Sequence, residues 1–372
     1  MRFSVLDSWR GLCALWVALY HFRVLSHVND AWLTRHGFIA VDFFFALSGF
    51  VIAHAYGDKL LTGAQRVRFF LRRFGRLYPL HIVTLAVVVA METARWAAGR
   101  QLGHDIGRPT FEGETGFVAL AANLVLVQGL GFFHKFSWNI PSWSISVELA
   151  VCVIFAVTSI LRRPLVTALV LAAGASALLY WLAHNDPWEG HTALTRGVCG
   201  FFMGVLAQRL HGLFRQKGWS VPGWIEFATP VLAFGAMWFW DQTLWPASAL
   251  MFAIIVFIFA FEAGPLSRLM KIPALMAWGE VSYSIYLIHY PLVLAIFGAA
   301  AVFGAVTGTD LLVQGRTLDL DLGSPWLGDL ATVGFLAVVI GLAMLSYRWV
   351  ESPGRRWFNS LSDRISDGSD KG

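Results

Sequence analysis

The first apolar segment of the chain carries two groups that could do chemistry, Arg10 near its start and His21 near its end. Eleven helical steps of about 1.5 Å each would place them about 16 Å apart along one axis, about half the thickness of a bilayer core. In a membrane-spanning helix, Arg10 would lie at one water interface and His21 deep inside. An imidazole at that depth can accept a proton from a substrate, and it is costly to bury without a partner. The pair therefore predicts a general base within a membrane.

The composition of the chain is that of a membrane protein. Of its 372 residues 57% are hydrophobic and 14% are charged, and the mean hydropathy is +0.62, which is far from the balance of soluble domains. The formal charge of +5 does not indicate nucleic-acid binding, because the basic residues gather on one predicted membrane face. The three cysteines lie in apolar runs without metal-ligand spacing, so we expect them to be packing residues and we expect no metal site.

Ten apolar runs are long enough to cross a bilayer as helices. They lie at about residues 8–26, 38–56, 78–98, 141–161, 165–184, 192–210, 224–243, 246–262, 277–303 and 329–349. An even number of spans places both termini on one side, and 20 of the 28 Lys and Arg residues fall on that side. The positive-inside rule then makes both termini cytoplasmic. The sequence thus predicts an all-α, multi-pass bundle of about ten helices.

Two segments do not span in this scheme. The apolar run 116–131 is short, and counting it as a span would invert the charge distribution of everything after it, so we expect it to be re-entrant or interfacial. The segment 359–372 is polar enough to be a disordered cytoplasmic tail. Residues 1–358 would then form one integral-membrane domain.

Three ionisable groups are predicted at one depth in the membrane, namely His21, Glu148 and His289. Groups from three helices near the midplane could form one polar chamber in which His and Glu pair or line water. Asp42 and Ser48 on the second segment could line a route to it from outside. For His289 a purely structural role has about the same weight as a catalytic one. It has less weight for Glu148, because a buried carboxylate is costly unless paired.

The serines next to Glu148 have a simpler interpretation. Ser144 and Ser146 could be no more than interhelical hydrogen-bonding groups. A Ser-His-Asp hydrolase is the weaker interpretation, because no GxSxG motif surrounds any serine.

A basic cluster precedes the third apolar run, where FFLRRFGRLYPL contains Arg72, Arg73 and Arg76. Such a cluster can be an orientation signal and nothing more. Guanidinium groups spaced over one helical turn also suit phosphates, through bidentate charge-assisted hydrogen bonds. A phosphorylated cosubstrate could therefore bind at the cytoplasmic face.

Six motifs together resemble the integral-membrane acyltransferase 3 family. They are the Arg10 to His21 spacing, FFFALSGFVIA at 43–53, RRFGRLYP at 72–79, PSWSISVE at 141–148, YSIYLIHYP at 283–291 and VESPGRRW at 350–357. The FFxLSGF motif alone is weak, but six motifs in the family's order are specific, and the resemblance runs from about residue 3 to residue 358.

The resemblance implies an enzyme that moves an acyl group, usually acetyl, from cytoplasmic acyl-CoA to a hydroxyl, commonly of a cell-surface glycan. It implies functional roles for Arg10 and His21, a role in holding CoA phosphates for Arg73 and Arg76, and a site role for Glu148. The predicted substrate pocket comprises Asp42, Ser48, Trp143, Ser144, Ser146, Tyr286 and His289.

The predicted mechanism is direct acyl transfer in the plasma membrane, with His21 as general base and Glu148 or His289 orienting the acceptor or the imidazolium. Acyl-CoA is the only cosubstrate expected, and a carbohydrate or glycolipid is the expected acceptor. An acyl-histidine intermediate is the mechanistic alternative. The alternative from another class is a non-enzymatic transporter in which His21 and Glu148 relay protons, although no inverted repeats are visible.

Overall fold

The computed structural model describes residues 3–102, 109–186, 188–239, 241–314 and 318–369. Its helices up to residue 216 are α1 (Ser4–His21), α2 (His27–Asp30), α3 (Trp32–Arg35), α4 (Ala40–Tyr56), α5 (Gly63–Leu102), α6 (Phe117–Leu124), α7 (Trp143–Thr158), α8 (Pro164–Asn185) and α9 (Glu189–Gln216). They are followed by α10 (Ile225–Ala236), α11 (Trp245–Phe259), α12 (Pro265–Met270), α13 (Pro273–Glu280), α14 (Ser282–Thr307), α15 (Pro325–Ser346) and α16 (Ser352–Ser369). A small hairpin of β1 (Leu312–Gln314) and β2 (Leu318–Leu320) connects α14 to α15.

Each of the ten predicted segments contains a helix, and the all-α, multi-pass class is confirmed. Among the described residues, seven helical stretches are long and apolar enough to cross a bilayer. These seven contain α4, α5, α7, α8, α9, α14 and α15. The other three segments correspond to α1, with 18 residues that include Asp7 and Arg10, and to the shorter apolar helices that contain α10 and α11.

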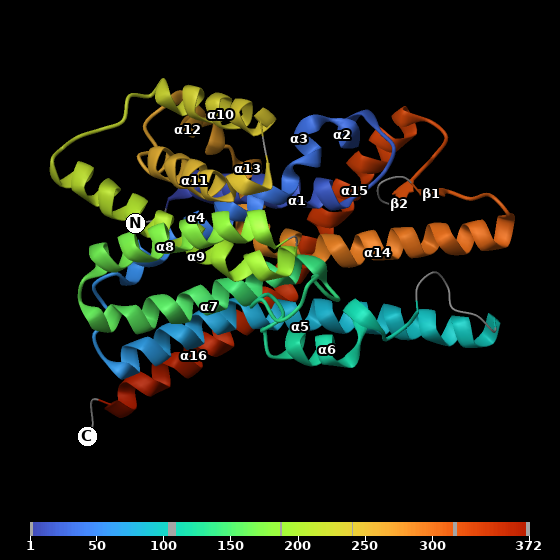
Figure 1. Cartoon of the computed structure of the whole chain (residues 1–372), viewed down its shortest axis with the longest axis horizontal. Helices are drawn as coiled ribbons and strands as arrows, with labels where there is room; N and C mark the ends of the chain where they lie inside the picture. Colours follow the sequence, from blue (N-terminus) through green and yellow to red (C-terminus); the bar gives the residue numbers. More distant parts are fainter. Residues whose placement is uncertain (1–2, 103–108, 187, 240, 315–317, 370–372) are drawn as a thin grey trace.

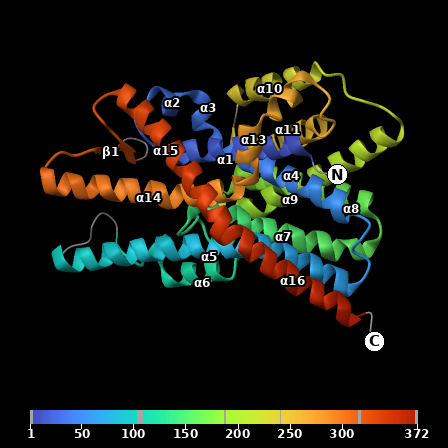
Figure 2. The ribbon, with the colours of Figure 1, turned by 180° about the vertical axis from the view of Figure 1, so that it is seen from behind.

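Both termini lie at the same end of the bundle, as Figures 1 and 2 show from opposite sides. This arrangement agrees with an even number of crossings. We refer to this end as the terminal face. The helix α1 starts there, so Arg10 lies nearer the terminal face and His21 nearer the opposite one.

The predicted disordered tail is instead the end of a helix. From Ser352 the chain forms α16, which continues to Ser369 and packs along the first half of α5 (Figures 1 and 2). Arg72 of α5 donates to Ser362 Oγ and Asp363 Oδ1, at 3.1 and 2.8 Å. These contacts give the polar residues of α16 partners along α5, which composition alone does not indicate. Residues 370–372 lie outside the described part of the chain.

Two helix pairs approach closely at glycines. A Cβ on Gly204 of α9 would lie 1.9 Å from the carbonyl oxygen of Ala46 in α4, and a Cβ on Gly279 of α13 would lie 2.2 Å from that of Asp7 in α1. Small residues of this kind allow membrane helices to pack backbone against backbone. The second contact brings α13 directly against the turn of α1 that carries Arg10.

The short apolar segment after residue 116 does not span. Its helix α6 has eight residues, about 12 Å of helix, which is less than half of a bilayer core. It lies against α5, where the Tyr78 hydroxyl donates to the Leu124 carbonyl at 3.1 Å and His81 Nε2 is 2.9 Å from the Asn123 carbonyl. The helix is therefore too short to cross a bilayer, and the re-entrant or interfacial placement of the segment stays a prediction.

Candidate functional site

Arg10 is fixed by the first residues of α14 and the end of α13. Its Nε donates to Ser282 Oγ and its Nη2 to the Gly279 carbonyl, both at 2.7 Å, and Asp7 lies 3.4 Å away. The close approach of α1 and α13 at Gly279 makes the second of these bonds possible. The guanidinium is therefore held in one orientation by hydrogen bonds to two helices.

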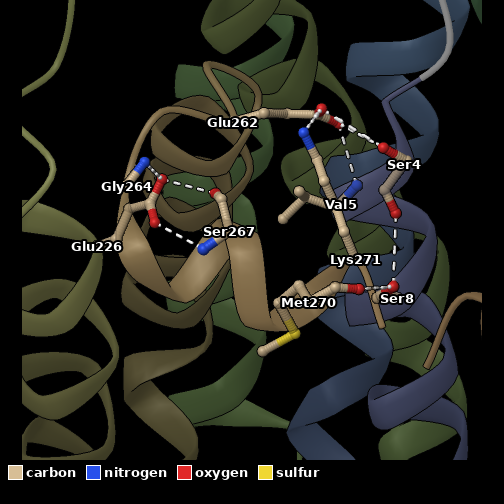
Figure 3. A network of polar contacts seen from close by, with 9 residues as sticks. All are labelled: Ser4, Val5, Ser8, Glu226, Glu262, Gly264, Ser267, Met270 and Lys271. Atoms are coloured by element: carbon tan, nitrogen blue, oxygen red, sulfur yellow. Dashed lines mark hydrogen bonds and ion pairs between the residues drawn. The ribbon is translucent and has the colours of Figure 1, made fainter. Parts of the chain in front are cut away.

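Two carboxylates, the buried Glu226 and the half-buried Glu262, hold the segment that leads into α13 against the start of α1, as Figure 3 shows. Glu226 of α10 accepts from Gly264 N and Ser267 N at 2.8 Å and from Ser267 Oγ at 2.6 Å. Glu262 accepts from Val5 N at 3.0 Å and pairs with Lys271 at 2.7 Å. Because the donors are backbone groups and short side chains, the segment is tied at both ends, and α13 is positioned for its contact with Arg10.

A cavity of about 90 Å³ lies beside Arg10. We call it the arginine cavity, and its lining includes Arg10, Ser48, Arg73, Arg76, Ser144, Glu148, Tyr283 and Tyr286. Three guanidinium groups and one carboxylate face this small space. The excess of positive charge suits an anionic ligand.

The three arginines of the basic cluster are not equivalent. Arg73 and Arg76 line the arginine cavity, whereas Arg72 is turned to α16 and bonds Asp363 and Ser362. The prediction that all three bind the cosubstrate is therefore corrected for Arg72, which has a protein carboxylate as its partner. Within the described part of the chain, Arg73 and Arg76 have no hydrogen bond to protein, and Arg73 lies 5.8 Å from the ring centres of Tyr56 and Phe69.

Glu148 faces the arginine cavity and not the histidines. Its Oε1 accepts a hydrogen bond from Ser48 at 3.2 Å, and both residues line that cavity. The predicted single chamber of His21, His289 and Glu148 is wrong in this respect. Helical rise gives the depth of a residue, but the direction of its side chain depends on the rotation of its helix.

His21 and His289 do meet. Nε2 of His289 lies 3.2 Å from Nδ1 of His21, and that same Nδ1 lies 2.9 Å from the Val17 carbonyl oxygen. A carbonyl can only accept, so the network assigns the proton of neutral His21 to Nδ1, with His289 Nε2 as a second acceptor. Nδ1 of His289 likewise contacts the Ile285 carbonyl at 3.2 Å. The Nε2 of His21 is thereby left unprotonated, as a base requires.

His21 lines a second cavity of about 250 Å³, which we call the histidine cavity. Its other lining residues include Tyr20, Phe136, Pro141, Trp143, Glu189, Thr192, Arg196, Trp245 and Tyr286. Phe136 and Trp143 are stacked, with ring centres 4.7 Å apart, and Arg196 lies 3.6 Å from the ring centre of Trp245. The cavity thus combines aromatic faces with one imidazole, one guanidinium and one carboxylate.

Asp42 holds Arg196 in place and does not line the cavity itself. The carboxylate is completely buried and accepts from Arg196 Nε at 2.6 Å and from Ser248 Oγ. The prediction that Asp42 lines the substrate route is corrected, because Arg196 stands between it and the space. Arg196 is not among the predicted site residues, and the signal that could identify it is a lone cation inside the apolar run 192–210.

Ser146 also lies away from both cavities. It is fully buried, and its Oγ accepts a hydrogen bond from Gly129 N at 3.1 Å. It therefore anchors the loop after α6, which matches the alternative of a structural serine. Ser144, two residues earlier, lines the arginine cavity and contacts Tyr286.

The sequence interpretation also missed Glu351, which ends the π-helical turn Tyr347–Glu351 between α15 and α16. Its side chain is buried, accepts from Ser284 Oγ at 2.8 Å and interacts electrostatically with Arg76 and Arg10. A π-turn often marks a functional site, because it re-aims a side chain that a regular helix would place elsewhere. The VESP motif contains this carboxylate, but nothing in its sequence gives the direction of the side chain.

Close in sequence to Glu189 of the histidine cavity, hydrogen bonds to Asp186 join the end of α8 to the start of α9. Hydrogen bonds from His191 and from the backbone of Trp188 hold the pKa of Asp186 below its usual value. The carboxylate is therefore ionised at neutral pH.

Among the described residues, no group of three or more His, Cys, Asp or Glu side chains could hold a metal ion.

The chain is similar to several named proteins. It is 36% identical to protein 2 of the picA locus of Rhizobium radiobacter over 187 residues, which cover 48% of this chain and 93% of that protein. It is 34% identical to acyltransferase MdmB of Streptomyces mycarofaciens over 40% of this chain and 37% of MdmB. A candidate membrane-bound transacylase of Komagataeibacter xylinus, BcsY, is 24% identical over 95% of this chain and 83% of its own length. No solved structure matches the chain significantly.

The family comparison covers nearly all of the membrane part. A family model described as an acyltransferase domain matches residues 3–348, a range that contains both cavities and every residue of their linings. Membership in an enzyme family argues against the transporter alternative. The chain therefore belongs to the acyltransferase 3 family and is a multi-pass membrane acyltransferase.

Proposed function

We propose that this protein transfers an acyl group, most simply acetyl, from acyl-CoA to a hydroxyl group of a carbohydrate outside the cytoplasm. The enzyme would lie in the plasma membrane with its terminal face toward the cytoplasm, where acyl-CoA is found. The observation that carries the proposal is the fixed proton of His21 on Nδ1, which leaves Nε2 as a base inside a cavity that can hold an acceptor.

The arginine cavity is the proposed donor site. Arg73 and Arg76 make no hydrogen bond to another described residue, although Glu351 interacts electrostatically with Arg76, and both lie in the first half of α5, which starts at the terminal face. Guanidinium groups bind phosphates through paired, charge-assisted hydrogen bonds. The cavity volume of about 90 Å³ suits the slim acyl end of a donor, so the nucleotide end would remain outside it.

The histidine cavity is the proposed acceptor site. It is the larger of the two, with a volume of about 250 Å³, and the aromatic faces of Trp143 and Trp245 suit the apolar faces of sugar rings. Glu189 and Arg196 offer an acceptor and donors for ring hydroxyls. This combination supports a carbohydrate better than a wholly apolar acceptor.

In the proposed reaction, His21 Nε2 takes the proton of the acceptor hydroxyl as that oxygen attacks the thioester carbonyl. The new C–O bond forms and the C–S bond breaks, and the imidazolium returns the proton to the departing thiolate. The products are the acyl ester and CoA thiol. The hydrogen bonds from its Nδ1 to Val17 O and His289 Nε2 stabilise the imidazolium as it forms. No covalent acyl-enzyme is required in this reaction. A route through an acyl-histidine intermediate would give the same products.

The test is purified protein in liposomes with radiolabelled acetyl-CoA and an extract of surface carbohydrate from cells that lack the protein. We expect release of CoA thiol that depends on the acceptor, and label in the carbohydrate fraction. The control is protein with His21→Ala. Label that accumulates on the protein would favour the acyl-histidine route, and flux of a solute without any thiol release would contradict the proposed function.

A further inference from the structure

One side chain separates the two cavities. Among the described residues that line them, Tyr286 of α14 is the only one common to both the arginine cavity and the histidine cavity. Arg10, Ser48 and Glu148 lie on one side of it and His21 on the other. In this structure the proposed donor site and the proposed base are therefore not in open contact.

The tyrosine ring is held across the gap by α7 and the turn before it. Its hydroxyl lies 2.8 Å from Ser144 Oγ and 3.1 Å from the Pro141 carbonyl oxygen. The carbonyl can only accept, so the hydroxyl can donate to Pro141 while it accepts from Ser144. Ser144 lines the arginine cavity and Pro141 the histidine cavity, so this hydrogen-bonded group forms the boundary.

Packing and neutral hydrogen bonds hold the Tyr286 side chain. Tyr286 is 5% exposed, and its nearest rings are Phe44 and His289, with ring centres 5.5 and 6.0 Å away in edge-to-face contact. Neither charge nor covalent linkage fixes it. Two neutral hydrogen bonds each contribute modestly in net terms, because the groups exchange them for others.

Direct transfer requires the acyl carbon, the attacking oxygen and the base within about 3 to 3.5 Å of one another. The phosphates of the donor would be bound on one side of Tyr286 and the base lies on the other. We propose that Tyr286, bonded to Ser144 and Pro141, is a movable partition that must swing aside for the acyl group to reach the histidine cavity. This inference rests on the proposed function for its purpose, but the partition itself is a property of the fold.

The partition has a chemical benefit in the proposed reaction. While it is closed, water in the histidine cavity cannot reach a thioester in the arginine cavity through this route. Hydrolysis of the donor without an acceptor is then suppressed. The same closure separates the aqueous phases on the two sides of the membrane.

The test uses one cysteine reporter in each cavity and needs no turnover. Val51→Cys places a thiol in the arginine cavity and Thr192→Cys in the histidine cavity. A small, charged, membrane-impermeant methanethiosulfonate is added to oriented vesicles from one face at a time. The parent protein gives the background, since Cys13, Cys152 and Cys199 are all buried.

We expect Val51→Cys to react from the terminal face and Thr192→Cys from the opposite face. In a Tyr286→Ala background, each reporter should also react from the other face, at least tenfold faster than before. Tyr283→Ala is the matched control, because Tyr283 is three residues earlier on α14 and lines the arginine cavity alone. It should leave the sidedness unchanged.

If Tyr286→Ala does not fold, Tyr286→Phe keeps the ring and removes both hydrogen bonds, and it should give an intermediate increase. Cross-labelling that stays at the background level in the folded Tyr286 variant would overturn the partition. An equal increase in Tyr283→Ala, or reporters that already react from both faces in the parent, would also overturn it. None of these outcomes depends on acyl transfer, so failure of the proposed function would be seen separately, in the thiol-release assay.

Discussion

The arginine cavity and the histidine cavity lie on either side of one tyrosine, yet they differ in size, charge and chemistry. The first is small, about 90 Å³, and is lined by three guanidinium groups and one carboxylate. The second is about 250 Å³ and is lined by aromatic rings, one imidazole, one guanidinium and one carboxylate. A charged, narrow site and a wide, aromatic site are what a phosphorylated donor and a ring-shaped acceptor would each require. The structure thus holds two cavities that share a boundary, and not one chamber, and the difference between them supports the proposed division into a donor site and an acceptor site.

The helix α1 contributes a side chain to both cavities. Arg10 is the seventh residue of α1 and His21 is its last, so the spacing of the two groups along α1 sets the separation of the two cavities. The glycine contact of α1 with α13 and the carboxylate networks of Figure 3 hold the Arg10 end. The contact with His289 holds the other end.

Among the variants that test the division between the two cavities, His21→Ala is expected to have the largest effect on acyl transfer. General-base catalysis typically contributes 10²- to 10⁴-fold, so we expect transfer to fall by about a thousandfold. Binding of acetyl-CoA should change by less than about twofold, because His21 does not line the arginine cavity. Turnover and equilibrium binding of acetyl-CoA measure the two effects.

The matched control is His184→Ala on α8. Nδ1 of His184 contacts a carbonyl four residues earlier at 2.9 Å, as that of His21 does, but the side chain is exposed and lines neither cavity. It should leave turnover unchanged. Full activity of well-inserted His21→Ala protein would remove His21 as the base.

The next largest effect is expected on the stability of the protein, when the ion pair of Asp42 and Arg196 beside the histidine cavity is broken. Asp42→Asn would leave the guanidinium of Arg196, whose side chain is 8% exposed, without its carboxylate. Removing one partner of a buried ion pair costs about 3 kcal/mol or more, so the melting temperature in detergent should fall clearly. Replacing both partners by apolar residues, Asp42→Leu with Arg196→Met, should restore part of the stability.

Asp58→Asn is the control for Asp42, because Asp58 is paired with Arg209 at 3.5 Å but is largely exposed. Its melting temperature should equal that of the wild type. An Asp42→Asn protein as stable as the Asp58→Asn protein would show that the pair does not support the cavity.

The positions of the helices along the chain could be predicted from the sequence. The faces by which the helices contact one another could not. Apolar runs of about 20 residues predict where helices lie, because a bilayer demands that length and satisfied backbone groups. The direction of a side chain depends on neighbours that are distant in sequence. Arg196 lies 154 residues from its partner Asp42, and no local pattern joins them.

The basic cluster illustrates the same limit. Arg72 and Arg76 are four residues apart and Arg73 and Arg76 are three apart, so either pair could share a face of α5. The contact with α16 distinguishes the two pairs, because α16 packs on the Arg72 side of α5 and Asp363 accepts a hydrogen bond from Arg72. The polar composition after residue 358 had suggested disorder, and so it concealed the element that makes the distinction.

This distinction gives the third prediction. Arg73→Ala with Arg76→Ala should weaken acetyl-CoA binding by about a hundredfold, since a hydrogen bond to a charged group contributes at least about tenfold in affinity and two such groups are removed. The affinity of the wild type should decrease with added salt, because the proposed interaction is between charges. Arg72→Ala is the matched control, and it should bind acetyl-CoA nearly normally because its side chain faces α16.

Arginines near a membrane face also direct orientation. A cysteine-accessibility map of both variants must therefore accompany the binding curves. If the double variant inserts inverted while correctly oriented molecules bind acetyl-CoA normally, the two arginines are only an orientation signal. Equal decreases of affinity in Arg72→Ala and the double variant would contradict the division between cavity and α16.

The smallest effect is expected for Glu148→Gln, and it tests on which side of the boundary this carboxylate acts. Glu148 faces three guanidinium groups, and its replacement removes a negative charge from the proposed phosphate site while keeping its shape. Acetyl-CoA should then bind about threefold more tightly at low salt, and high salt should abolish this increase. Turnover at saturating donor should change by less than about tenfold, because Tyr286 stands between Glu148 and His21. Glu189→Gln, in the histidine cavity, should leave donor affinity unchanged.

The contradicting outcome is a decrease of turnover by about a thousandfold in Glu148→Gln with unchanged affinity for acetyl-CoA. An effect of that size is expected of a general base, and it would place Glu148 at the reacting atoms. The two cavities would then have to join during the reaction around this residue.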